Sequence, residues 1–145
     1  MPRTLSGPQQ APAPTGPARL PQASDACLSA DGFVLDAHKL DCYHVACEFQ
    51  LLACTLVPVA EHVLRDQLER ASVGIVLTIA EGAGRRSRRD KARFYTMARG
   101  SAMECAAVVD LLYLRALAPV AACQRARSLL VRLVQMLTKL QASLA

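Results

Sequence analysis

The chain has no tryptophan, and aromatic residues make up only 4% of its 145 residues, although 52% are hydrophobic. Strands favour β-branched and aromatic side chains, whereas the alanine and leucine that dominate here favour helices. The composition therefore argues against a β-sheet protein and predicts an all-α one. A chain of this length is expected to form one domain, whose core needs no metal or disulfide.

The sequence also lacks an apolar run long enough to cross a bilayer, because charged residues interrupt every candidate and the apolar segment 51–60 is short and contains Pro58. No apolar block follows Arg3, so no secretory signal is predicted. These absences predict a cytoplasmic protein with no membrane partner. The six cysteines include no CxxC pair, and we expect reduced thiols, most of them packed as small apolar side chains.

Prolines are scarce after the N-terminal region, because six of the eight lie within residues 1–32. The rest of that region is mainly Gly, Gln, Ser and Ala, a composition that cannot support a packed element. We therefore predict a disordered tail over residues 1–32 and a folded domain over residues 33–145.

Apolar residues at helical spacing predict four helices in the folded domain. Their expected ranges are 34–56, 59–83 (or from Glu61), 88–117 and 120–144. The expected inward stripes are Leu40, Tyr43, Ala46, Cys47, Leu51 and Cys54; Leu64, Leu68, Ala71, Ile75 and Ile79; Phe94, Met97, Ser101, Cys105, Val108 and Leu112; and Leu130, Leu133, Leu137, Leu140 and Leu144. Short links between the helices predict an antiparallel up-down four-helix bundle.

The link between the second and third helices carries recognisable end signals. Gly82 and Gly84 are expected to stop the second helix, because glycine takes left-handed conformations at little cost. Ser87 is expected to cap the third helix, with Asp90 three residues later at the capping-box position. Pro119 marks the next turn.

Charge is distributed unevenly along the chain. Residues 25–84 carry three basic and nine acidic residues, residues 85–145 carry twelve basic and three acidic, and no acid follows Asp110. Such asymmetry indicates either a polyanionic partner or self-association between regions of opposite charge.

The segment 85–93, which we call the basic elbow, holds most of this positive charge. Its six cations are opposed only by Asp90; they are Arg85, Arg86, Arg88, Arg89, Lys91 and Arg93. Arginine forks match phosphate oxygens, and the amides at the start of a helix add affinity for anions. The elbow therefore predicts contact with a nucleic-acid backbone. Ion pairs between helices or subunits explain the same run equally well.

The fourth helix adds a row of cations at seven-residue spacing, which places them on one face. We predict seven nucleic-acid-binding residues from the two regions: Arg86, Arg88, Arg89, Lys91, Arg125, Arg132 and Lys139. No motif of a sequence-specific reader accompanies them, so binding to RNA or DNA is expected to be non-specific.

No catalytic constellation is recognisable, and we predict no enzyme activity, metal site or cofactor. Glu81 precedes Arg85 by four residues, a spacing that favours an ion pair. Glu104 is expected to pair with Arg70, Arg93 or Arg99. Ser101 has no identifiable base to activate it. His38, His44 and His62 lie too sparsely among the cysteines for a zinc site.

Residues 66–107 closely resemble the signature of the 23S ribosomal RNA intervening-sequence proteins. The matching residues include the runs Gln67-Leu68-Glu69-Arg70-Ala71-Ser72 and Thr78-Ile79-Ala80-Glu81-Gly82, followed by Gly84-Arg85, Ser87, Arg93-Phe94, Gly100-Ser101 and Glu104. The family pattern has Asn at position 78, Arg at 69 and Ile at 97, where this chain has Thr78, Glu69 and Met97. The resemblance implies a structural role for Arg70, Glu81, Gly82, Gly84, Arg85, Ser87, Arg93, Ser101 and Glu104.

The resemblance also implies a four-helix bundle that assembles into a ring-like homopentamer. It further implies similarity to the basic accessory proteins of diversity-generating retroelements, which bind nucleic acid and a reverse transcriptase. The leading hypothesis is a non-enzymatic, self-assembling bundle that binds nucleic acid through an arginine-rich surface, with RNA or DNA and a reverse transcriptase as partners. The alternative is a structural homo-oligomeric scaffold or adaptor whose arginines form subunit interfaces.

Overall fold

A computed structural model describes residues 34–58 and 61–145 of the chain. These residues form the short 3-10 helix η1 (Asp36–Lys39) and the α-helices α1 (Asp41–Leu56), α2 (His62–Gly84), α3 (Arg88–Leu114) and α4 (Val120–Ala142). The two described ranges contain no strand, so the predicted all-α class is confirmed. The predicted tail, residues 1–32, lies outside the described residues.

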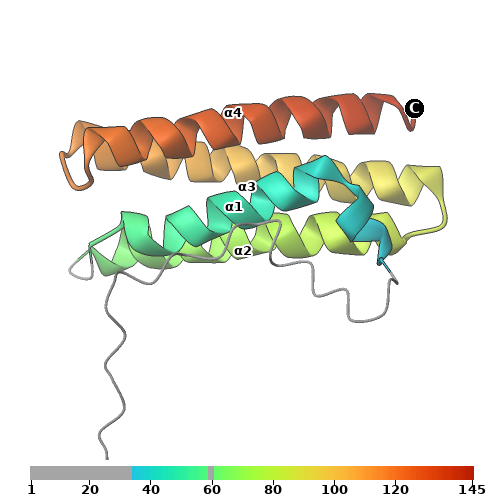
Figure 1. The fold of residues 1–145 in the computed structure, drawn as a ribbon, viewed down its shortest axis with the longest axis horizontal. Coiled ribbons are helices and arrows are strands. Elements are labelled where there is room, and N and C mark those ends of the chain that lie inside the picture. The colour runs from blue at the N-terminus through green and yellow to red at the C-terminus, as the bar shows by residue number, and fades with distance from the viewer. Residues whose placement is uncertain (1–33, 59–60) are drawn as a thin grey trace, which may run out of the picture.

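The helices form one elongated bundle in which successive helices run in opposite directions along the long axis (Figure 1). Helix α1 packs against α2 and α4, and α3 packs against the same two helices. This closed ring of neighbours is the predicted up-down four-helix bundle. The α2–α3 link lies at the same end of the bundle as η1 and the C-terminus, and the α3–α4 link lies at the other end (Figure 1).

The inward stripes predicted for α2 and α4 are confirmed. Buried positions on these helices include Leu68, Ala71, Ile75, Ile79, Leu130, Leu133 and Leu137. Leu64, Leu140 and Leu144 are partly buried against the same core. Leucine and isoleucine recur at spacings of three and four along the inward face of each of these segments, so their periodicity identifies the face that packs inward.

The predicted stripes of α1 and α3 are partly wrong. Helix α1 buries Val45, Phe49 and Ala53, whereas Cys54 is exposed; helix α3 buries Tyr95 and Ala98, and Met97 is exposed. Cys105, Val108 and Leu112 are buried as expected. Both helices carry apolar residues on more than one face, so apolar spacing alone does not decide which face turns inward.

Two helix ends also differ from the predicted ones. The first helix begins at Asp41 instead of near 34, because Leu40 has extended dihedrals (φ −98°, ψ 119°) and separates η1 from α1. Helix α3 ends at Leu114, because Ala116 takes a left-handed conformation (φ 52°). The Leu117 amide bonds to the Leu112 carbonyl (2.9 Å) and the Ala116 amide to the Tyr113 carbonyl (3.1 Å). This pattern is a Schellman motif that closes the helix.

Gly82 and Gly84 do not act as predicted, because both lie within α2 and neither has a positive φ. Gly82 is needed for space instead. A Cβ atom at Gly82 would stand 2.8 Å from the Phe94 Cβ and 3.0 Å from the Tyr95 ring, whereas one at Gly84 would meet nothing within 4 Å. Gly82 therefore lets α2 approach α3 closely next to the link.

Candidate nucleic-acid interface

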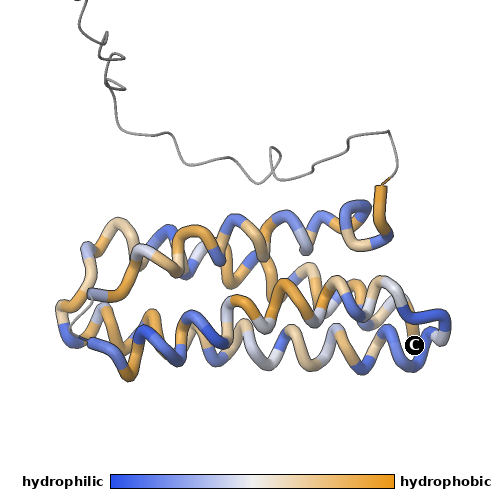
Figure 2. The backbone as a smooth tube through the Cα atoms, turned by 90° about the horizontal axis from the view of Figure 1, so that it is seen from below, coloured by the Kyte–Doolittle hydropathy of each residue, from blue (hydrophilic) through white to orange (hydrophobic). Residues whose placement is uncertain are grey.

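The basic elbow begins with a turn made of extended residues. Arg85 (φ −72°, ψ 145°) ends α2, and Ser87 (φ −75°, ψ 131°) precedes α3. The Ser87 hydroxyl accepts a hydrogen bond from the Asp90 amide (3.4 Å), which confirms the predicted cap. The link forms a hydrophilic stretch at the end of the bundle where the C-terminus lies (Figure 2).

Arg85 holds the two helix ends together. Its guanidinium donates to the Glu81 carboxylate one turn earlier in α2, as the spacing of these residues predicts. The same guanidinium lies over the Phe94 ring of α3, 4.7 Å from its centroid, a cation–π arrangement. Arg85 therefore has local partners on both sides of the link and serves the packing of the elbow.

Arg88 and Lys91 bind the carboxyl ends of two helices. The Arg88 guanidinium donates to the carbonyl of Ser143, which follows α4 (2.7 Å), and the Lys91 ammonium donates to the carbonyl of Ala83 in the last turn of α2 (2.7 Å). Cations are favourable there because the last carbonyls of a helix lack partners and carry partial negative charge. Both acceptors are neutral carbonyls, so these contacts add no acidic group to the elbow.

Arg86, Arg89 and Arg93 are exposed and make no hydrogen bond or ion pair with any residue in the described part of the chain. For Arg93 this differs from the sequence reasoning, which expected an acidic partner such as Glu104. Their guanidinium groups keep all their donors available, since nothing nearby occupies them. These three side chains are therefore the cations of the elbow that are available to an external anion.

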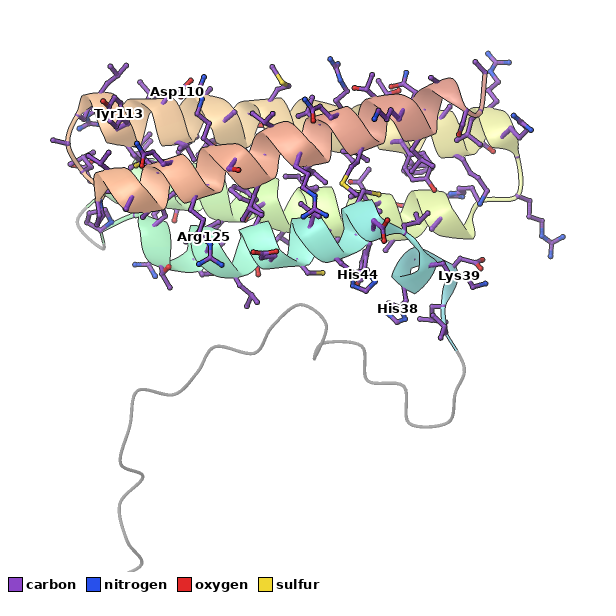
Figure 3. All side chains as sticks on the ribbon, turned by 45° about the horizontal axis from the view of Figure 1, so that its top comes forward. His38, Lys39, His44, Asp110, Tyr113 and Arg125 are labelled. Atoms are coloured by element: carbon purple, nitrogen blue, oxygen red, sulfur yellow. The ribbon has the colours of Figure 1, made fainter. Side chains whose placement is uncertain are left out.

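The row of cations on α4 does share one face, but that face lies beside α1. Arg125 reaches toward α1 (Figure 3), where it pairs with Glu48 (3.3 Å). Lys139 lines a groove with Leu40 and Cys42, at the start of α1. Arg132 makes no pair within ranges 34–58 and 61–145. Lys139 lies one turn before Ser143, the residue that Arg88 contacts, so only the carboxyl end of this row adjoins the elbow.

Half of the ten acidic side chains in the described residues pair with cations outside the elbow. The ion pairs that join different helices or links are Arg70–Glu104 (3.6 Å), Arg115–Glu61 (3.4 Å), Arg125–Glu48 (3.3 Å) and Arg127–Asp110. The side chains remain largely exposed, so each pair contributes little to stability. Outside the elbow the described residues carry nine basic and nine acidic side chains, so the net positive charge of the described residues lies at the elbow.

Comparison with known proteins agrees with this fold. A sequence model described as 23S rRNA-intervening sequence protein matches residues 38–139, most of the 145-residue chain. The chain belongs to this family. No curated protein gives a significant match. Among the described residues of this family member, no helix is long and apolar enough to span a membrane.

Two further family-motif residues, Glu104 and Ser101, lie where α3 packs against α2. The Glu104 carboxylate accepts a hydrogen bond from Gln67 and pairs with Arg70, one of the three partners expected for it. Ser101 lies beside Gly74, where an added Cβ would stand 3.9 Å from the hydroxyl. Ser101 makes no hydrogen bond to a base within the described residues. The motif is thus built into the close α2–α3 contact.

The thiols and histidines of this family member also serve packing. Burial raises the pKa of the Cys42 thiol to about 11 and that of Cys105 to about 12, so both stay protonated and unreactive at neutral pH. The ring Nε2 of His44 forms a hydrogen bond with the carbonyl of His38 (2.8 Å), which joins the first turn of α1 to η1, the helix that contains His38 (Figure 3). No three metal-binding side chains converge in the described ranges.

Proposed function

We propose that this protein is a non-enzymatic, self-associating bundle that binds the backbone of nucleic acid through the basic elbow. The observation that supports this most directly is the charge of Arg86, Arg89 and Arg93 at one end of the bundle, because none of the three pairs with an acidic side chain among the described residues. Phosphates are the anions that arginine forks match best.

The start of α3 supports the same proposal. The first amides of a helix have no partner inside the helix and attract anions. Ser87 caps only the Asp90 amide. Arg88 and Lys91 add charge without taking up an acidic group, because they bond to carbonyls. A phosphate at this point would meet cations and amides together.

The cations of the elbow can contact the phosphate backbone of a nucleic acid, but the elbow presents no side chain that distinguishes one base from another. The Phe94 ring beside the elbow already has the Arg85 guanidinium over it, and the neighbouring Tyr95 is buried, so neither ring is presented for base stacking. Cations that meet only phosphates carry no sequence information. We therefore expect RNA and DNA to be bound without sequence preference. The reverse transcriptase partner that the family resemblance implies stays a prediction.

The second candidate function is a homo-oligomeric scaffold without nucleic acid, in which the elbow arginines pair with acids of another subunit. The exposed apolar residues of α2 and α3, such as Leu77, Met97 and Leu111, favour self-association. Unpaired acids that could serve the elbow between subunits include Asp41, Asp66 and Glu69, which have no partner among the described residues.

One variant separates the two candidates: Arg86, Arg88, Arg89 and Lys91 all changed to Ala. If the elbow binds phosphates, the variant keeps its oligomeric mass and helicity and loses most of its affinity for a labelled oligonucleotide. If the elbow is a subunit interface, the variant dissociates in light scattering. Failure of the wild-type protein to bind RNA or DNA at low salt would refute the proposal.

A further inference from the structure

Two of the free cations of the elbow lie on the outward face of α3. Arg89 and Arg93 are one turn apart on this helix, and Arg86 lies in the link just before it. At about 100° per residue, the two helical positions lie roughly opposite Tyr95 and Ala98, which face the core. Arg89 and Arg93 therefore point away from the other helices, and both are exposed, as Arg86 is.

The backbone that carries these cations is fastened to three helices. Arg85, at the end of α2, lies over the Phe94 ring of α3. Arg88 donates to a carbonyl that follows α4, and Lys91 donates to a carbonyl in the last turn of α2 (2.7 Å each). The fold thus sets the spacing of the free cations in advance. A ligand whose charges are also fixed in space loses the least freedom when it binds such a surface.

A nucleic-acid duplex is a ligand of this kind. Duplex DNA stays stiff over about 150 base pairs, so its phosphates keep their spacing over the short length that an elbow can contact. A duplex also carries one charge per about 1.7 Å of its axis, half the spacing of about 3.4 Å along one strand. A compact cluster of cations therefore meets about twice the phosphate charge on a duplex that it meets on a single strand.

Single strands gain affinity from a feature that the elbow lacks. Proteins that bind them stack bases on exposed aromatic rings, which contributes roughly tenfold or more in affinity per base. Beside the elbow, Tyr95 is buried and the Phe94 ring has a guanidinium 4.7 Å from its centroid. The Tyr43 ring of α1 packs against two histidine rings. Tyr113 is exposed, but it lies at the opposite end of the bundle (Figure 3).

We propose that the basic elbow binds double-stranded nucleic acid, DNA or RNA, in preference to single strands. The inference rests on the proposed function and specifies its substrate class. Cations that contact phosphates do not read base edges, so base pairing hides nothing that the elbow needs. A single strand, in contrast, offers the elbow fewer phosphates, and its unpaired bases find no ring on which to stack.

Fluorescence anisotropy with matched probes tests this inference. The probe is a labelled strand of about 20 nucleotides, two turns of duplex, without self-complementarity; it is used alone and annealed to its complement, once as DNA and once as RNA. At equal salt, the wild-type protein should bind each duplex at least about tenfold more tightly than the corresponding single strand. Its affinity should also fall more steeply with salt for the DNA duplex, because the slope per phosphate is about 0.9 for B-DNA and about 0.7 for single strands.

Two variants show whether the preference arises at the elbow. Arg89→Ala with Arg93→Ala removes the outward cations of α3 and should lower affinity for duplexes more than for single strands. Arg115→Ala with Arg127→Ala removes the same charge elsewhere and should leave the ratio of the two affinities unchanged. Circular dichroism checks that each variant is folded.

The outcomes separate this inference from the proposed function. A single strand that the wild type binds as tightly as its duplex, in DNA or in RNA, would refute the inference alone. A preference for duplex that is unchanged in the Arg89 and Arg93 variant would also refute it, because the preference would then arise elsewhere. A wild type that binds none of the four probes at low salt would refute the proposed function and the inference together.

Discussion

The two links at opposite ends of the bundle both reverse the direction of the chain (Figure 1), but by different means. The α2–α3 link uses extended residues, a serine cap and a glycine that lets the helices approach. The α3–α4 link uses a Schellman motif with Ala116 at its left-handed position, and its cation Arg115 pairs with Glu61. The α2–α3 link leaves Arg86 without an acidic partner, whereas the α3–α4 link pairs its Arg115, which indicates that a compact turn alone does not require the charge of the elbow.

The largest effect on stability is expected at the close approach of the α2–α3 link. Gly82→Ala places a methyl group 2.8 Å from the Phe94 Cβ, and neither backbone can yield without moving a helix. Overpacking of this kind costs about 1–3 kcal/mol. Gly84→Ala is the control, because it meets nothing within 4 Å and should leave stability unchanged or slightly raised. Urea unfolding followed by circular dichroism measures both, and equal stability of the two variants would contradict the packing role of Gly82.

A smaller loss is expected when the cations that bind helix carboxyl ends are removed. Arg88→Ala with Lys91→Ala deletes the bonds to the Ser143 and Ala83 carbonyls. Because the Arg88 bond is exposed and the Lys91 bond is only partly buried, the pair is expected to contribute about 1 kcal/mol in total. Arg86→Ala with Arg89→Ala removes the same charge but no contact. The first variant should melt at a lower temperature than the second, and identical melting would mean that the carbonyl bonds add nothing.

At the far link, Ala116→Gly should raise stability by about 0.5–1 kcal/mol. Alanine at φ 52° carries a steric penalty that glycine avoids, although glycine also gains entropy in the unfolded chain. Ala121→Gly, at an exposed helical position in α4, should lower stability and serves as the control. Thermal melting that shows both changes destabilising would argue against the left-handed conformation.

The smallest effect is expected for the ion pair of the far link. Arg115 and Glu61 lie 3.4 Å apart, and the Arg115 side chain is 51% exposed. Exposed pairs of this kind contribute about 0.2–1 kcal/mol. A double-mutant cycle with Arg115→Ala and Glu61→Ala measures the coupling, and a value well above this range would show that the far link depends on charge as strongly as the elbow does.

The helix count, the links and two inward stripes were predictable from the sequence because leucine, isoleucine and proline mark them unambiguously. The cap at Ser87 and the Glu81–Arg85 pair depend on residues four or fewer positions apart, and local spacing predicts such contacts well. The inward stripe of α3 was not predictable in full, because its apolar residues recur at the same spacing on two faces of the helix. Only packing against the neighbouring helices decides which face is buried.

The roles of the cations were the hardest to predict, since a run of arginines does not reveal which of them have partners. Arg88 binds a carbonyl 55 residues away along the chain, and Arg125 binds Glu48 on a helix that is distant in sequence. Gly82 carried a misleading signal, because a glycine at a helix end normally indicates a left-handed cap. Only the close packing of α3 on α2 shows that glycine is needed at position 82 because a side chain would not fit there.

The most direct test of the central claim compares nucleic-acid binding after the loss of two cations at either end. Arg86→Ala with Arg89→Ala removes two of the three free cations of the elbow, and Arg115→Ala with Arg127→Ala removes the same charge from the far end. Fluorescence anisotropy with a labelled oligonucleotide, across a range of salt concentrations, gives affinity and salt slope. The elbow variant should lose at least about tenfold in affinity, and its slope should flatten by about 1.4–1.8, the value for two phosphates. The far-end variant should bind like the wild type, and equal losses for both variants would contradict binding at the elbow.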